Sequence, residues 1–198
     1  MVARGERFVF AQSIGDVAAF LGLDVDAAPK LSPDELIRRL DTVLAAAARL
    51  CRQMPDAHLA TELPNRPRSY RVLMHHVFRI PEAFLDAMRG ETLSHEMLVA
   101  PPPPDMTSAE AVAAYGDAVR RRALAWWESF EDRDCAAPVP TYYGNPPLHE
   151  VLERTVWHAA QHVRQLASLL EGLGVRPDRP LTAADLEGLP LPERVWDD

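Results

Sequence analysis

The sequence predicts an all-α fold, a four-helix bundle preceded by a short strand and helix. Two observations favour it: four long segments place apolar residues at helical spacing, and capping motifs or prolines mark where these segments begin. The chain has 198 residues, with 47% hydrophobic and 25% charged side chains, which is ordinary for one globular domain with a sizeable core. We expect the bundle to occupy residues 31–175.

Start and stop signals define the first two long helices. Ser32 and Glu35 form a capping box with a proline at the first helical position, and this motif opens a helix that we expect to run to about Gln53. The second helix is expected to begin near Ser69. It should end at Gly90, because glycine readily adopts the left-handed conformation that closes a helix.

The third and fourth long helices carry similar signals. Thr107 and Glu110 form another capping box, and apolar residues follow at helical spacing as far as Phe130. Asn145 and the two prolines after it open the fourth helix, which stops at Gly172. These four helices are the expected walls of the bundle.

The segments between and after these helices are rich in proline. Residues 101–104 are all prolines and predict a stiff extended connector, and a second linker covers roughly residues 131–143. Both are longer than simple up-and-down hairpins require, which leaves room for a crossover topology. The last segment, residues 176–198, contains apolar side chains that need cover, so we expect it to pack on the bundle or on a partner subunit.

The first 30 residues differ from the rest in their pattern of apolar and polar residues. Alternation through residues 7–10 predicts a strand, and Ser13 is expected to cap a short helix that ends at Gly22. A piece this small does not fold alone, so we expect residues 1–30 to be an appendage on the bundle or across a dimer interface. It is similar to the closing strand and helix of a glutaredoxin, without a Cys-x-x-Cys motif.

Composition excludes several classes of function. The formal net charge of -8 argues against a nucleic-acid partner, because phosphate binding needs clustered Lys and Arg. No apolar run approaches the roughly 20 residues that span a bilayer, and the N-terminus lacks a signal peptide, so we expect a cytoplasmic protein. Cys51 lies on an apolar stripe and Cys135 among acidic residues, so neither is expected to form a disulfide or to act as a nucleophile.

Two histidines lie one helical turn apart in the fourth helix. Four residues at about 100° each return to within about 40° of the starting direction, so His158 and His162 lean from one face. This face is otherwise largely apolar, whereas Glu150 and Glu153 lie elsewhere on the helix. Both histidines should therefore point toward the core, with no carboxylate of this helix beside them.

A third histidine lies on an apolar stripe of the second helix. His76 shares its stripe with Leu73, Val77 and Ile80, whereas His75 falls on a polar stripe and is expected to face outward. One inward histidine is more often a hydrogen-bonded core residue than a ligand. Three together favour a metal ion, which accepts all three lone pairs at about 2.0 to 2.1 Å.

These positions resemble a known family. The spacing His158-x-x-x-His162-x-x-Gln165, with His76 inside LMHHVFRIPEAFL, resembles the DinB-like superfamily, also called DinB/YfiT-like. The closing GLPLPERVW is similar too, so the resemblance covers roughly residues 31–196. It implies a four-helix bundle that binds a divalent metal through such histidines, often as a homodimer.

The resemblance leaves the reaction open, because its members differ in activity. Zinc, nickel or iron(II) would suit three imidazoles and leave positions open on the ion. The first hypothesis is a thiol transferase or isomerase that uses glutathione, bacillithiol or mycothiol as cosubstrate. The second is a hydrolase that uses metal-bound hydroxide, and the third is a noncatalytic, stress-associated metal-binding bundle. No catalytic residue is assigned, and Gln165 is a candidate to orient an imidazole or a metal-bound ligand.

Overall fold

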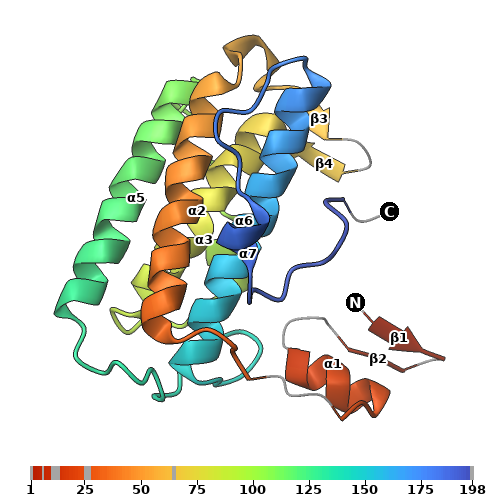
Figure 1. Ribbon diagram of the computed structural model, residues 1–198, viewed down its shortest axis with the longest axis vertical. Helices are drawn as coiled ribbons and strands as arrows, with labels where there is room; N and C mark the ends of the chain where they lie inside the picture. The colour runs from red at the N-terminus through yellow and green to blue at the C-terminus, as the bar shows by residue number, and fades with distance from the viewer. Residues whose placement is uncertain (1, 6, 10–13, 25–27, 64–65, 197–198) are drawn as a thin grey trace. The chain divides into compact units, whose positions relative to one another are not determined.

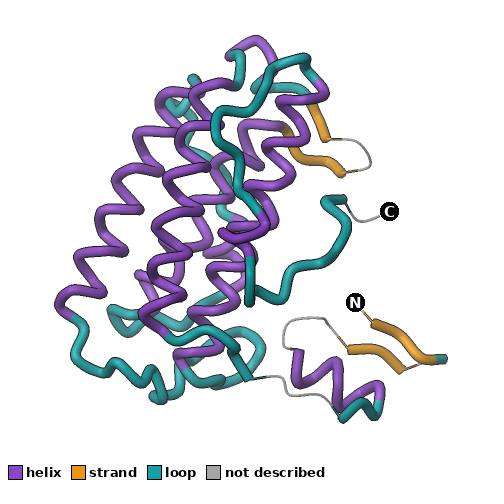
Figure 2. Tube along the Cα trace, in the orientation of Figure 1, coloured by secondary structure: helices purple, strands orange, loops and turns teal. Residues whose placement is uncertain are grey.

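A computed structural model describes residues 2–5, 7–9, 14–24, 28–63 and 66–196 of the chain. The chain forms two compact units, residues 1–30 and 31–198. Helices make up most of the larger unit, as Figure 2 shows, and its strands are short. This architecture confirms the predicted all-α class.

Four long helices form the bundle: α2 (Pro33–Gln53), α3 (Tyr70–Ala87), α5 (Ala109–Ser129) and α6 (Leu148–Gly172). Helices α2 and α3 each pack against both α5 and α6, so the first two helices of the bundle lie diagonally across it. Helices α2 and α6 run in one direction and α3 and α5 in the other (Figure 1). The connection from α3 to α5 therefore crosses from one end of the bundle to the other.

Side-chain caps begin three of these helices. The Ser32 hydroxyl accepts a hydrogen bond from the Glu35 backbone N–H, and the hydroxyl of Ser69 caps α3 in the same way. The expected cap at Thr107 is wrong by one residue, because Ser108 caps α5. The Asp56 carboxylate also accepts a hydrogen bond, 2.8 Å long, from the first N–H of α5, which fixes where this helix begins.

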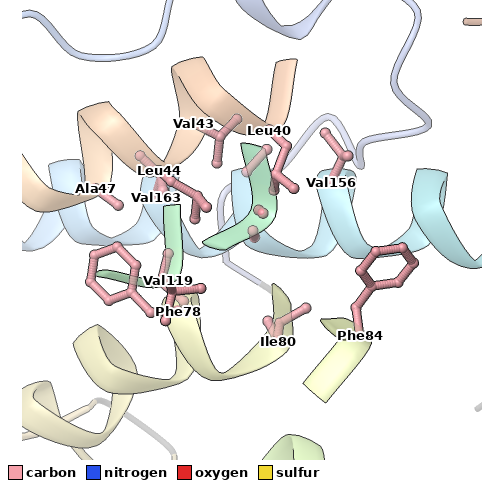
Figure 3. Packing of buried hydrophobic residues seen from close by; sticks show 14 of the residues in the cluster. Leu40, Val43, Leu44, Ala47, Phe78, Ile80, Phe84, Val119, Val156 and Val163 are labelled. Atoms are coloured by element: carbon pink, nitrogen blue, oxygen red, sulfur yellow. The ribbon is translucent and has the colours of Figure 1, made fainter. Parts of the chain in front are cut away.

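The core runs along the axis of the bundle and draws on all four helices (Figure 3). Its labelled members are Leu40, Val43, Leu44, Ala47, Phe78, Ile80, Phe84, Val119, Val156 and Val163. At Gly116 of α5, a Cβ atom would lie 2.3 Å from ring carbons of Phe78 in α3. The glycine is therefore required by packing in the middle of a helix, where its intrinsic propensity is poor.

Several short elements connect the long helices. A 3-10 helix (Asp56–His58) and a hairpin of β3 (Glu62–Leu63) and β4 (Arg66–Ser69) join α2 to α3. Helix α4 (His95–Val99) precedes α5, and α7 (Ala183–Leu186) lies in the C-terminal segment. None of these was predicted, because elements this short carry no clear periodicity.

The N-terminal unit contains a hairpin and one helix. Strands β1 (Val2–Arg4) and β2 (Arg7–Val9) pair antiparallel, and α1 (Ile14–Leu21) follows them. The guanidinium of Arg7 lies 5.5 Å from the centre of the Phe20 ring. The expected strand is therefore present, in a hairpin whose first strand was not foreseen, and the expected cap Ser13 lies outside the described residues.

Candidate metal centre

The three histidines selected from the sequence lie together. One ring nitrogen from each of His76, His158 and His162 lies within 4.8 Å of those from the other two. The ring centroid of His76 is 5.5 Å from that of His158 and 4.9 Å from that of His162, and the two rings of α6 are 5.0 Å apart. Among the described residues, no aspartate, glutamate or cysteine joins this group.

A backbone carbonyl orients His76. Helix α4 has only five residues, so its last carbonyls lack partners within the helix. Nδ1 of His76 lies 2.8 Å from the Leu98 carbonyl oxygen, and because a carbonyl can only accept, this nitrogen must carry the proton. The lone pair of His76 is therefore on Nε2, the nitrogen left to bind a metal ion.

A glutamine orients His162 in the same sense. The Nε2 amide of Gln165 donates a hydrogen bond to the Val195 carbonyl at 3.1 Å, which places its Oε1 toward the imidazole. Nδ1 of His162 lies 2.7 Å from this oxygen and therefore donates to it. The lone pair of His162 is again on Nε2. Gln165 is 4% exposed, so this hydrogen bond is shielded from water.

The C-terminal segment covers the polar face of α6. Carbonyl oxygens of Pro192, Glu193, Arg194 and Val195 accept hydrogen bonds from side chains of this face. Gln161 is 7% exposed as a result. Glu153 is also buried, and it does not join the histidine group.

Burial keeps the imidazoles of His76 and His158 neutral. Desolvation lowers the pKa of His76 to about 3, with the charge of a protonated His162 as the next cause. Desolvation likewise lowers the pKa of His158 well below its ordinary value, and repulsion from His162 and His76 acts in the same direction. Neutral imidazoles with lone pairs are the form that binds metal ions. The donor set therefore fits a divalent ion such as zinc, nickel or iron(II).

His75 is not where the sequence pattern placed it. It was expected to face outward, yet it is 4% exposed and its ring stacks on Tyr115 with 5.1 Å between centroids. The polar stripe of α3 packs against α5, where the Tyr115 hydroxyl donates to Glu82, and Glu82 also pairs with Arg79 and Arg122. His75 therefore contacts α5 and takes no part in the histidine group.

This geometry coincides with a family match. A family model described as the DinB superfamily matches residues 39–166. The chain belongs to the DinB superfamily. In this DinB protein the match includes α3 and the α6 histidines, so the resemblance drawn from the sequence is confirmed. A search of curated proteins found no match. No helix in the described part of this DinB protein is long and apolar enough to cross a membrane.

Sequence reasoning missed three groups around the cluster of this DinB protein. The Leu98 and Val195 carbonyls are backbone atoms, and no residue type signals them. The third group is the guanidinium of Arg154, which lines a cavity with His158. Its position one turn before His158 was the available signal, because a cation four residues away on a helix lies on nearly the same side.

Proposed function

We propose that this protein holds one divalent metal ion with His76, His158 and His162 and activates a low-molecular-weight thiol for an S-transfer or isomerase reaction. The observation that supports this most directly is the pair of hydrogen bonds from Nδ1 of His76 and of His162. They leave an Nε2 lone pair on each ring, within a group whose ring nitrogens lie within 4.8 Å of one another. Orienting partners of this kind are typical of metal sites.

Three imidazoles support a reactive ion better than a purely structural one. Structural zinc sites usually have four protein ligands, whereas catalytic sites keep one position for water or substrate. In the part of the chain that the structure describes, three histidines make up the whole group, with no carboxylate or thiolate as a fourth ligand. The remaining position would accept the cosubstrate.

A thiol can be activated at such an ion without a neighbouring carboxylate. Zinc hydrolases often use a glutamate beside the ion as general base. No glutamate or aspartate joins the histidine group among the described residues. A thiol that coordinates a divalent ion loses its proton without such a base. Glutathione, bacillithiol and mycothiol are the candidate cosubstrates.

The protein's own residues position and shelter this site. The Leu98 carbonyl and Gln165 hold two of the imidazoles, and the 192–195 segment in turn holds Gln165. Both cysteines are buried, and burial raises the pKa of the Cys135 thiol to about 11, so neither competes with an added thiol as nucleophile. We propose that the protein acts in the cytoplasm, where small thiols stay reduced. We also propose that it is a homodimer.

Cobalt substitution tests this proposal. The metal-depleted protein is loaded with cobalt(II), and each of the three thiols is titrated while the absorption spectrum is recorded. We expect a sulfur-to-cobalt charge-transfer band with at least one thiol, because the thiol would enter the open position. A loaded protein whose spectrum no thiol changes would contradict thiol activation and favour hydrolysis or a structural ion. A protein that takes up no cobalt would contradict the metal site itself.

A further inference from the structure

A small cavity adjoins the histidine group on the side of His158. Its volume is about 10 Å³, which is enough for about one water molecule. Apolar side chains of α3, α6 and the segment 93–98 line most of it, and its polar residues are Tyr143, Arg154, Thr155 and His158. The cavity therefore has room for one small polar group only, beside one of the predicted metal ligands.

Arg154 is the cation of this cavity. Its Nη2 donates a hydrogen bond to the Tyr142 hydroxyl at 3.2 Å, and its guanidinium carbon lies 4.7 Å from the centre of the Tyr143 ring. Its Nε is buried and has no hydrogen-bond partner in the part of the chain that the structure describes. The two tyrosines therefore contact a guanidinium whose remaining N–H groups can donate further hydrogen bonds.

Several other part-buried arginines of the bundle bond to carboxylate or carbonyl oxygens. Arg79 pairs with Glu82 at 2.7 Å, and Arg120 pairs with Asp41. Within the described ranges, no ion pair joins Arg154 to a carboxylate. A guanidinium partly removed from water without a counter-ion is unfavourable. The guanidinium of Arg154 can therefore pair with an anion that comes from outside the chain.

We propose that Arg154 binds the carboxylate of a small molecule whose reacting group lies at the histidine group. This deepens the proposed function and rests on it, because it names the class of molecule that the site accepts. A planar guanidinium can donate two parallel hydrogen bonds to a carboxylate, and apolar walls strengthen them by excluding water. The carboxylate can belong to the thiol, since glutathione and bacillithiol carry carboxylates and mycothiol does not, or to the electrophile that the thiol attacks.

Matched small molecules test this assignment in the cobalt-loaded protein. Binding of 3-mercaptopropionate is compared with that of 3-mercaptopropionamide, which lacks only the charge, by calorimetry and by the cobalt spectrum. We expect the carboxylate form to bind roughly tenfold tighter or more, because hydrogen bonds between charged groups are of this strength. Arg154→Gln should remove the difference without changing the cobalt content. Arg38→Gln, on a side chain that is 73% exposed, is the control for the change in net charge.

Equal binding of the charged and neutral thiols by the wild type, with propionate no better than propionamide, would overturn the assignment. A preference that survives Arg154→Gln would overturn it too. Arg154→Lys keeps the charge without the planar fork and should retain part of the preference, so it tests the assignment if the glutamine variant does not fold.

Two further comparisons are needed. One shows whether the thiol or the electrophile carries the carboxylate, and the other distinguishes failure of the anion site from failure of the metal site. If propionate binds as tightly as 3-mercaptopropionate, the carboxylate is assigned to the electrophile. If only 3-mercaptopropionate binds more tightly than its amide, and propionate does not, the carboxylate is assigned to the thiol. Calorimetry on metal-free protein needs no ion. A chain that takes up no metal yet prefers propionate to propionamide through Arg154 would contradict the proposed metal site and still support the anion site.

Discussion

Replacing Gln165 by alanine should weaken metal binding without removing any ligand. Oε1 of Gln165 accepts a hydrogen bond, 2.7 Å long, from Nδ1 of His162, and the site is shielded from water. Loss of such an orienting partner typically lowers metal affinity by about 10- to 100-fold, which corresponds to about 1.4 to 2.7 kcal/mol. The cause is that the freed imidazole can rotate or change tautomer, so its Nε2 lone pair is no longer fixed toward the other two rings.

The assay is a competition titration of metal-depleted protein against a chelator of known affinity. Gln161→Ala is the matched control, because Gln161 is also buried on α6 and donates to the same Val195 carbonyl at 2.7 Å, whereas the acceptor of His162 Nδ1 is Gln165. Both variants should loosen the C-terminal segment, but only Gln165→Ala removes the hydrogen bond that orients the His162 imidazole. An equal loss of affinity in the two variants, or no loss in either, would refute the orienting role of Gln165.

Three further predictions concern stability. Gly116→Ala should destabilise the fold by about 1 to 3 kcal/mol in urea unfolding, since the added Cβ would press into the Phe78 ring; unchanged stability would show that the ring moves aside at no cost. In metal-free protein the free energy of unfolding should fall as the pH drops from about 6.5 to about 4, because the unfolded chain protonates His75 while burial holds its folded pKa at about 4. His76 and His158, whose pKa values burial also lowers, contribute to the same slope, so His75→Phe should reduce it in part, and an identical slope would contradict the assignment. Removal of residues 192–198 should lower the melting temperature and weaken metal binding, because Gln165 loses its acceptor; a variant with unchanged values would show that this segment is dispensable.

The long helices were predictable because their signals are local. Ser32 and Ser69 cap helices where the sequence placed them, and the apolar stripes of these helices form the core. The short elements were not predictable, because α4 and the β3–β4 hairpin depend on contacts with α3 rather than on their own pattern. The shift from Thr107 to Ser108 has a similar cause, since Asp56 reaches α5 from a distant part of the chain.

The candidate site was predictable in its side chains and less so in their surroundings. Helical spacing brings His158 and His162 to one side, and the apolar stripe of His76 directs it to the same interior. The outward assignment of His75 failed because a polar stripe can be buried when another helix supplies hydrogen bonds and ion pairs to it. The burial of polar side chains on α6 had no signal in the sequence, because it depends on backbone carbonyls of the 192–195 segment.

The most direct test of a metal centre at these residues is elemental analysis of the untagged protein and of three alanine variants. We expect about one equivalent of a divalent metal per chain in the wild type and loss of most of it in His158→Ala and His162→Ala. His75→Ala should retain the metal, because His75 stacks on Tyr115 outside the group, although it should lower stability. Metal content that falls equally in all three variants, or that stays unchanged when His158 or His162 is replaced, would contradict the site.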